Sequence, residues 1–248
     1  MAVIHWNKKY GETLLITLER FRSTHPEFQD AKITYAGRLD PLAEGLMILL
    51  TDEDVHHKDR YNKLSKTYEV DFLFGVSSDT YDALGILKET KDPKPFPHKK
   101  DLSSFVGSLA GVQEQEYPPY SSKTIKGKSL WQYAREDQLD GIIFPKESRE
   151  VFSAELVSHR ELKRGELISE YLSVIDFIEG DFRQEEIKSH WERYLDERPD
   201  NRYTVFTARF GVSSGTYIRS LVHSIGEHYG CGALSLRIKR TQIAEHQL

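Results

Sequence analysis

Apolar residues recur along this chain with two periods, one typical of helices and one typical of strands. Between residues 12 and 21 they lie at helical spacing, and the same spacing returns further along. Helices are therefore predicted over 12–21, 101–109 and 216–229. Alternating apolar and polar positions, rich in β-branched and aromatic residues, predict strands over 67–74, 150–159 and 203–212.

Turn and cap residues separate these elements. Asp101 is a candidate N-cap for the second helix, and Gly230 closes the third. Three prolines and four lysines in 90–100 predict a surface loop. Residues 33–39 are predicted to be extended or loop. The apolar run 42–50 predicts a buried segment, either helix or strand.

A highly charged segment over 160–202 separates the last two predicted strands. We expect it to be largely helical from residue 160 to 198, with two apolar stripes on otherwise polar helices. The first stripe consists of Leu167, Tyr171, Val174, Ile175 and Ile178, and the second of Ile187, Trp191 and Leu195. Two amphipathic helices packed on a sheet are the simplest interpretation.

These elements predict a mixed α/β (α+β) fold built on a mostly antiparallel sheet flanked by helices. No proline-, glycine- or serine-rich linker divides the 248 residues. We therefore expect one domain over 1–248, with the charged helical segment inserted at about 160–202.

Composition narrows the class of protein. Thirty-four Lys and Arg against 39 Asp and Glu give a net charge of −5, which argues against a uniformly basic nucleic-acid-binding surface but not against a local basic face. No apolar run approaches the roughly 20 residues of a membrane span. The first residues show no signal peptide, so the cytoplasm is the expected compartment. One cysteine, Cys231, excludes an internal disulfide or a four-cysteine zinc site.

Metal and nucleotide motifs are weak in this chain. The adjacent pair His56 and His57 would point different ways on a regular element, so no metal site is expected. Neither a dinucleotide-binding nor a P-loop signature is present. The glycine-rich range 226–232 is typical of a helix C-cap. The range 213–216 is either a phosphate site at a helix N-terminus or an ordinary N-cap, with the cap favoured.

The most informative candidate for chemistry is Asp40, which follows a Gly-Arg-Leu turn and precedes Pro41 and the apolar run. On local grounds it is interpreted as a helix N-cap with Pro41 at the first helical position. A carboxylate between apolar residues, with little water around it, requires a cationic partner to offset its desolvation.

The stretch around Asp40 resembles the catalytic motif of pseudouridine synthases, and the chain as a whole is similar to the TruB-type tRNA pseudouridine synthases. Five blocks match that family in order, from an N-terminal turn to a C-terminal Gly-Thr-Tyr-Ile-Arg string. They are Asn7–Gly11, Gly37–Gly45, Lys66–Gly85, Tyr117–Arg135 and Ser214–Ala233. Each block alone is weak evidence, but five in register are specific.

The resemblance implies roles for individual residues. Asp40 corresponds to the catalytic aspartate, Tyr68 to the tyrosine that stacks on the target base, and Arg219 to the arginine that pairs with the aspartate. Ile238 takes the place of a pocket-lining leucine. The remaining residues expected to bind substrate are Lys8, Tyr35, Arg38, Lys66, Tyr120 and Tyr217.

Several positions depart from the family pattern. Tyr35 stands where the family has a histidine, and Lys9 and Ser214 replace a proline and a lysine. Arg38 gives a string closer to the pseudouridine synthases of ribosomal RNA. The chain stops eight residues after Arg240, so the C-terminal accessory RNA-binding domain of familiar members is expected to be absent.

Three basic clusters lie in or beside the matching blocks and predict an RNA-binding face. They are the cluster of His56, His57, Lys58, Arg60, Lys63 and Lys66, the cluster of Lys123, Lys126 and Lys128, and the cluster of Arg237, Lys239 and Arg240. The acidic residues of 179–200 would repel phosphates. We therefore expect the 160–202 segment to pack away from the RNA cleft, anchored by Trp191.

The resemblance implies an isomerase that converts uridine to pseudouridine in the T-loop of tRNA, at position 55 in tRNA numbering, without a cofactor. The expected partner is the T-arm of tRNA, and the expected state is a monomer with no protein partner and no membrane. Two alternatives stay open: a pseudouridine synthase that acts on ribosomal RNA, and a non-catalytic RNA-binding chaperone on the same fold.

Overall fold

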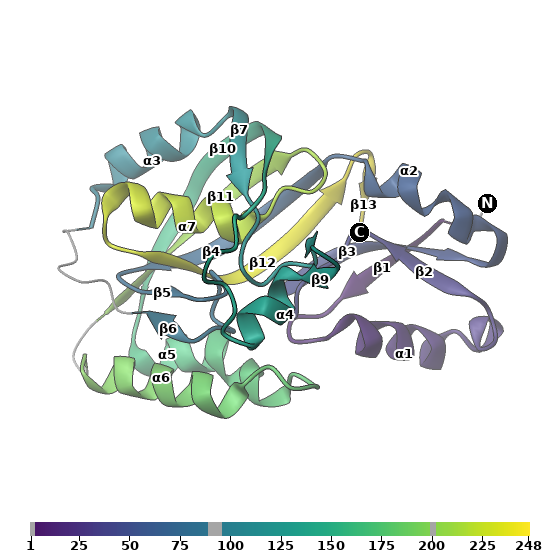
Figure 1. Ribbon diagram of the computed structural model, residues 1–248, viewed down its shortest axis with the longest axis horizontal. Coiled ribbons are helices and arrows are strands. Elements are labelled where there is room, and N and C mark those ends of the chain that lie inside the picture. The colour runs from purple at the N-terminus through teal and green to yellow at the C-terminus, as the bar shows by residue number, and fades with distance from the viewer. Residues whose placement is uncertain (1–2, 89–95, 199–201) are drawn as a thin grey trace.

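A computed structural model describes residues 3–88, 96–198 and 202–248. One large mixed sheet runs through the whole molecule, with helices on both sides of it (Figure 1). Its strand order is β1-β3-β12-β4-β11-β10-β7, with β2 added to β3 and β13 added to β12. Within it β3 and β12 pair in parallel, and every other pairing is antiparallel.

The strands of this sheet have the following bounds: β1 Val3–Lys8, β2 Ile33–Ala36, β3 Ala43–Thr51, β4 Lys66–Phe74, β7 Gly111–Glu116, β10 Lys146–Leu162, β11 Tyr203–Val212, β12 Ala233–Ile243 and β13 His246–Gln247. Two small hairpins lie outside it: β5 Ser77–Ser78 with β6 Leu87–Lys88, and β8 Thr124–Ile125 with β9 Lys128–Ser129.

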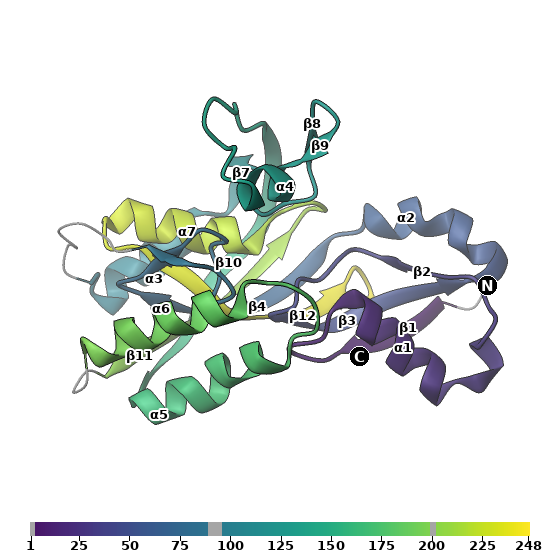
Figure 2. The ribbon, with the colours of Figure 1, turned by 60° about the horizontal axis from the view of Figure 1, so that its bottom comes forward.

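The α-helices are α1 Leu14–Thr24, α2 Lys58–Asn62, α3 Lys99–Ser108, α4 Leu130–Arg135, α5 Arg164–Leu167, α6 Gln184–Asp196 and α7 Ile218–Tyr229. Short 3-10 turns cover Pro26–Phe28, Asp52–His57 and Ser173–Phe177, and a π turn covers Ile168–Leu172. Helices α3 and α7 lie on one side of the sheet and α5 and α6 on the other, while α4 stands away from it with β8 and β9 (Figure 2). No helix among these residues is long and apolar enough to cross a membrane.

Strand β4 shows why both faces of the sheet are covered. Its side chains alternate, so that Val70 and Phe72 are buried with α7 on one face, whereas Leu73 is buried with Trp191 on the other. Each face is therefore apolar and needs a helical layer to shield it from water.

Most of the predicted elements are confirmed, with differences at their ends and one predicted helix that is absent from the described residues. Strands β4 and β11 match the predicted ranges, and the run over 42–50 is the buried strand β3. The predicted N-cap at Asp101 is wrong, because α3 is capped by His98. The predicted helix at Asp40 is also wrong, since a turn and then β3 follow Pro41. Most of the predicted loop over 90–100 lies outside the described residues.

The described part of the charged segment, residues 160–198, forms the layer beneath the sheet (Figure 2). Strand β10 takes its first residues up to Leu162, so the helical part begins at Arg164 rather than at residue 160. Both predicted apolar stripes face inward: Leu167, Tyr171 and Ile175 are buried, as are Ile187 and Leu195 with Trp191. The indole nitrogen of Trp191 also donates to the carbonyl of Ala83, at 3.0 Å. The predicted packing of Trp191 in this layer is confirmed, and its contribution to stability stays a prediction.

We expect Trp191→Ala to lower the free energy of unfolding by about 3–5 kcal/mol. The indole is only 3% exposed, and its removal leaves both a cavity and the carbonyl of Ala83 without its donor. Denaturant unfolding measures the effect. Phe177→Ala is the matched control: Phe177 lies in the same segment but is 79% exposed, so its loss should stay within about 0.5 kcal/mol. A Trp191→Ala protein as stable as the control would contradict the anchor.

Candidate active site

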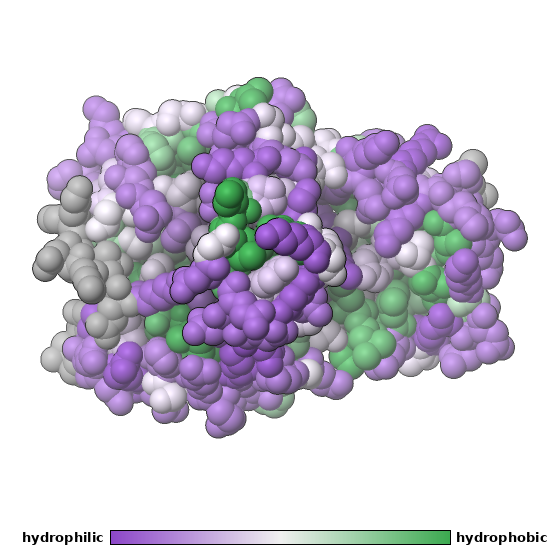
Figure 3. All heavy atoms as spheres, viewed as in Figure 1, coloured by the Kyte–Doolittle hydropathy of each residue, from purple (hydrophilic) through white to green (hydrophobic). Residues whose placement is uncertain are grey.

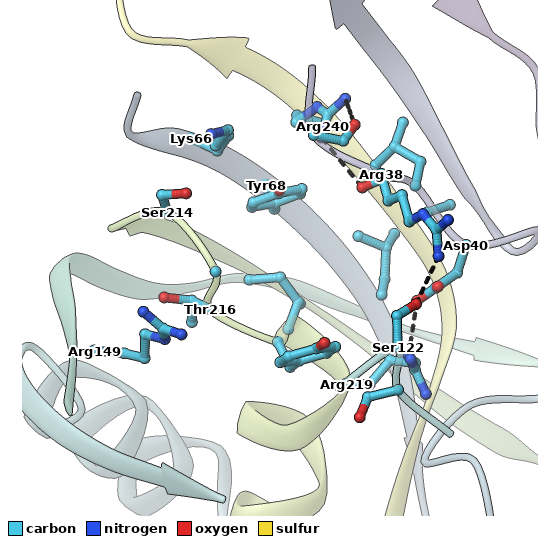
Figure 4. Close-up of a pocket in the computed structure, with 18 of the residues that line it drawn as sticks. Arg38, Asp40, Lys66, Tyr68, Ser122, Arg149, Ser214, Thr216, Arg219 and Arg240 are labelled. Atoms are coloured by element: carbon cyan, nitrogen blue, oxygen red, sulfur yellow. Dashed lines mark hydrogen bonds and ion pairs between the residues drawn. The ribbon is translucent and has the colours of Figure 1, made fainter. Parts of the chain in front are cut away.

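A cavity of about 330 Å³ opens over the centre of the sheet, where β4 and β12 lie side by side. Strands β4, β10 and β12, the β2–β3 loop, the segment after β7 and the β11–α7 loop supply its walls (Figure 4). The lining side chains that carry chemistry are Arg38, Asp40, Lys66, Tyr68, Tyr120, Arg149, Ser214, Thr216, Tyr217 and Arg219.

Asp40 reaches the cavity from the β2–β3 loop, and buried Arg240 fixes that loop. The Arg240 side chain donates to the carbonyls of Leu46, at 2.7 Å, and Gly37, at 3.1 Å. At Gly37, where φ is +78°, an added Cβ would lie 3.2 Å from the Arg240 guanidinium. Glycine therefore serves here both the turn and the close approach of the arginine.

Arg219, in the first turn of α7, is the cationic partner that Asp40 was predicted to require. Its Nε lies 2.9 Å from Asp40 Oδ2 and 3.6 Å from Asp82 Oδ2. Its two Nη atoms donate to the carbonyls of Thr80 and Tyr120. Each of the three guanidinium nitrogens thus has a partner.

The electrostatics of this group follow from burial. The Arg219 side chain is 5% exposed, and burial alone would lower its pKa, but the attraction of Asp40 and Asp82 outweighs it and raises the pKa. Burial raises the pKa of Asp82 to about 6, against the opposing attraction of Arg219.

The expectation that little water surrounds Asp40 is wrong. Its side chain is 47% exposed, because one face of the carboxylate rests on Arg219 while the other opens into the cavity. A carboxylate placed in this way is oriented by its cation and still accessible to a substrate atom.

Tyr68 and Ile238 form the part of the wall next to Asp40. Tyr68 projects from near the start of β4 and is almost buried, and Ile238 lies on the neighbouring strand β12. In Figure 4 the Tyr68 ring lies between Ser214 on one side and Asp40 on the other. Tyr217 and Tyr120 also line the cavity, so the structure brings all four predicted residues to one site.

Arg38 and Lys66 line the cavity in different ways. Arg38 is exposed and donates to Ser122 Oγ at 2.6 Å, which joins the β2–β3 loop to the segment after β7. Lys66 is buried, and its amine donates to the carbonyls of Asn62 and Leu64, both at 2.6 Å. Burial lowers the pKa of Lys66 to about 8. The Lys66 amine is therefore engaged by backbone carbonyls, whereas the Arg38 side chain is exposed to solvent.

Lys8 and Tyr35 lie outside the residues that line this cavity. The Lys8 amine is buried against the carbonyls of Pro41 and Ala43, where burial lowers its pKa to about 8. Through these two hydrogen bonds Lys8 stabilises the backbone that follows Asp40. Tyr35 lies on β2 with the Lys58 amine 5.0 Å above its ring.

The far end of the cavity contains residues that the sequence analysis did not assign. Arg149 of β10 lies there beside Ser214 and Thr216 (Figure 4). The favoured N-cap interpretation of 213–216 is wrong, since Tyr217 is the N-cap of α7. Arg149 is one of several charged residues along β10, so the local sequence does not distinguish it; its place in the cavity depends on which strand crosses there.

The three basic clusters are only partly available to a ligand. Lys66 and Arg240 are buried on backbone carbonyls, while Lys123 and Lys128 form ion pairs with Glu147 and Glu136. Four cations of the clusters are exposed: Arg60, Lys63, Lys126 and Lys239.

The charged segment also reaches the site. Residues 181–183, which precede α6, line a second cavity that shares Asp40 and Arg219 with the first. The expectation that the whole segment packs away from the cleft is therefore wrong, although α6 itself lies under the sheet.

Comparison with known proteins gives consistent matches. The family described as TruB family pseudouridylate synthase (N terminal domain) matches residues 25–167. Proteins named tRNA pseudouridine synthase B are similar over most of the chain. That of Caldicellulosiruptor saccharolyticus is 32% identical over 85% of this chain and 58% of its own length. That of Shewanella sp. (strain W3-18-1) is 29% identical over 99% of this chain and 62% of its own.

Solved structures show the same fold. A chain in the crystal structure of a Cbf5–Nop10–Gar1 complex has a TM-score of 0.58 and 17% identity, covering 98% of this chain and 50% of that chain. A chain of an H/ACA RNP bound to a substrate RNA containing 2′-deoxyuridine has a TM-score of 0.55 and 15% identity, with 99% and 48% covered. The present chain thus spans about half to two thirds of the length of its relatives.

The raised pKa of Asp82 predicts a stability that falls with pH. The pKa in the folded state, about 6, lies above the ordinary 3.8, so between these values the folded protein binds more protons than the unfolded chain. This group therefore contributes stability at low pH that is lost as the pH rises through 6. Relative to wild type, Asp82→Asn should gain roughly 3 kcal/mol in unfolding free energy between about pH 4 and pH 7.

Denaturant unfolding of both proteins across that range checks the difference. Asp181→Asn is the control, because its stability should change with pH in the opposite direction. Arg135 lowers the pKa of exposed Asp181, so the stability that this carboxylate contributes is lost as the pH falls. A difference between wild type and Asp82→Asn that is independent of pH would show that Asp82 titrates normally.

Proposed function

The chain belongs to the TruB family of pseudouridylate synthases, and we propose that it converts a uridine of tRNA to pseudouridine, with Asp40 as the catalytic carboxylate. One observation carries the proposal: the Asp40 carboxylate is held by Arg219 at 2.9 Å and opens into a cavity that Tyr68 lines. Two relatives are named tRNA pseudouridine synthase B, and this name suggests tRNA as the substrate.

The reaction is an isomerisation that demands positioning. The bond between N1 of uracil and C1′ of ribose breaks, the uracil turns, and a bond forms between C5 and C1′. The C5 proton leaves and N1 takes up a proton, so no atom is gained or lost. The enzyme must hold the detached base beside the sugar, which is catalysis by proximity and orientation.

Asp40 supplies the anion for this reaction in one of two ways. Its free oxygen either attacks C1′, forming a covalent intermediate, or removes the C2′ proton to give a glycal. In both routes Arg219 orients the carboxylate through its bond to Oδ2, and its forked guanidinium suits that task better than an amine. Because Arg219 is buried on four partners, it keeps its place when substrate enters.

Tyr68 offers a flat ring within the same cavity. A uridine must leave its stack to reach Asp40, and an aromatic ring offsets part of the lost stacking. Its hydroxyl is a candidate acceptor for the C5 proton. At the other end of the cavity Arg149, which also pairs with Glu147, offers a cation for a phosphate, while the hydroxyls of Ser214 and Thr216 donate to the carbonyls of Asn62 and Ser213.

The proposed target is the uridine at position 55 in the T-loop, bound by a monomer in the cytoplasm. Incubation of the protein with total RNA, followed by sequencing of modified uridines, tests the target. Pseudouridine confined to the T-loop of tRNA supports the proposal. Pseudouridine in ribosomal RNA would show that ribosomal RNA, and not tRNA, is the substrate. RNA binding without any product would favour an RNA-binding chaperone.

We expect Asp40→Asn to form no product while its affinity for tRNA stays within about tenfold of wild type. The carboxylate acts in bond breaking, whereas most affinity in such complexes comes from phosphate contacts. Product assays and filter binding measure the two quantities. Measurable turnover by the Asn variant would end the assignment of Asp40 as catalytic.

Tyr68→Phe separates the two roles of this residue. The Phe variant keeps the ring, so binding should survive while the rate falls steeply; Tyr68→Ala should lose both, with binding weaker by the about 1–3 kcal/mol of one stacked base. Single-turnover rates and dissociation constants distinguish them. A Phe variant as fast as wild type would show that the C5 proton goes to another group.

A further inference from the structure

A second cavity, of about 360 Å³, adjoins the first. The two share one wall, made of Asp40, Tyr120, Ser121, Ser122 and Arg219. Any molecule in the second cavity therefore lies directly beside the group that Asp40 acts on. Its volume falls within the range of about 300–1,000 Å³ that is usual for small-molecule sites.

The outer wall of the second cavity comes from two segments that are distant in the sequence. Trp131 and Arg135 come from α4, and Asp181, Phe182 and Arg183 come from the charged segment before α6. Arg135 joins the two, since its Nη1 donates to the carbonyl of Asp181 at 2.8 Å and its Nη2 pairs with the Asp181 carboxylate at 2.5 Å.

Arg183 supports the wall between the cavities. It has a left-handed backbone, with φ at +66°, and its Nη1 lies 2.7 Å from Asp79 Oδ2. Its guanidinium also lies 4.8 Å from the centre of the Tyr120 ring. Because these contacts occupy it from two sides, Arg183 holds Tyr120 in place and is not a free cation.

Trp131 differs from the other two tryptophans in being 44% exposed at the rim of this cavity. Helix α4, which carries it, is fixed by a capping box between Ser129 and Gln132. On this face of the molecule most side chains are hydrophilic, and a small group of hydrophobic ones stands out near its middle (Figure 3). A fixed aromatic ring open to water beside arginines is typical of a stacking platform for single-stranded nucleic acid.

We propose that the second cavity binds the nucleotide next to the target uridine, with its base stacked on Trp131 and its phosphate held by Arg135. The inference rests on the proposed function, because an RNA strand whose uridine occupies the first cavity brings its neighbouring nucleotide to the adjoining one. Neighbouring nucleotides are covalently joined, so the occupant of the second cavity positions the uridine against Asp40.

Arg135 can change partners on binding. Its present partner, Asp181, has a side chain that is 76% exposed, and exposed ion pairs contribute only about 0–1 kcal/mol. A phosphate offers the guanidinium a bidentate partner of higher charge. The pair between Arg135 and Asp181 therefore serves as a resting contact that RNA replaces.

The first experiment pairs Trp131→Ala with substrate RNAs. A T-arm hairpin is prepared with its normal sequence and with an abasic site on the 5′ or the 3′ side of the target uridine. Wild type should bind one abasic hairpin about 5- to 150-fold more weakly than the normal one, the effect of one stacked base. Trp131→Ala should bind the normal hairpin equally weakly and lose its response to that abasic site. Trp131→Phe should restore the response.

The second experiment concerns the phosphate. Arg135→Ala should weaken binding of the normal hairpin and lower the slope of log affinity against log salt by about 0.7, as for one lost phosphate contact. Arg164→Ala is the matched control, because Arg164 also pairs with an exposed carboxylate, that of Asp196, but lies away from both cavities. Its salt slope should equal that of wild type. Melting curves confirm that each variant is folded.

The outcomes separate this inference from the proposed function. If wild type forms pseudouridine and Trp131→Ala still responds to both abasic sites as wild type does, the second cavity is not a nucleotide site and the proposed function stands. An unchanged salt slope in Arg135→Ala would overturn the phosphate contact. A wild-type protein that forms no pseudouridine in any RNA would contradict the proposed function, and this inference with it.

Discussion

Burial of the Arg219 guanidinium is the constraint on which the site depends. A buried cation costs several kcal/mol unless it is paired and hydrogen-bonded, and here it bonds to Asp40 and two backbone carbonyls and pairs with Asp82 as well. Those four partners come from three separate loops. Each loop is therefore fixed relative to α7. The same contacts fix the wall that divides the two cavities.

Other buried cations act in the same way on the backbone. Lys8, Lys66 and Arg240 each donate to main-chain carbonyls of the turns that surround Asp40 and the β4 start. A carbonyl satisfied by a cation does not need water, so an irregular loop can lie in a buried place. Precise positioning of one carboxylate thus rests on four buried cations, Lys8, Lys66, Arg219 and Arg240, whose donors are engaged by the protein itself.

The charged segment 160–202 combines two tasks. Its apolar stripes cover one face of the sheet, with Trp191 bonded to Ala83 in the same loop that presents Asp82 and Thr80 to Arg219. Its turn before α6 then brings Arg183 against Asp79 and Tyr120. Stability of the fold and shape of the site are therefore coupled through one loop, residues 79–85.

Periodicity in the sequence determined the strands β4 and β11, the helix α7 and both stripes of the charged segment, because alternation and helical spacing record which side of an element is buried. The motif blocks pointed to Asp40, Tyr68 and Arg219, which the fold brings to one cavity. Tertiary structure alone decided the rest. Whether a lysine or arginine faces solvent or a carbonyl, as at Lys66 and Arg240, depends on contacts between distant segments that a local pattern does not contain. For the same reason no local pattern predicts that Trp131 and Arg183, 52 positions apart, line one cavity.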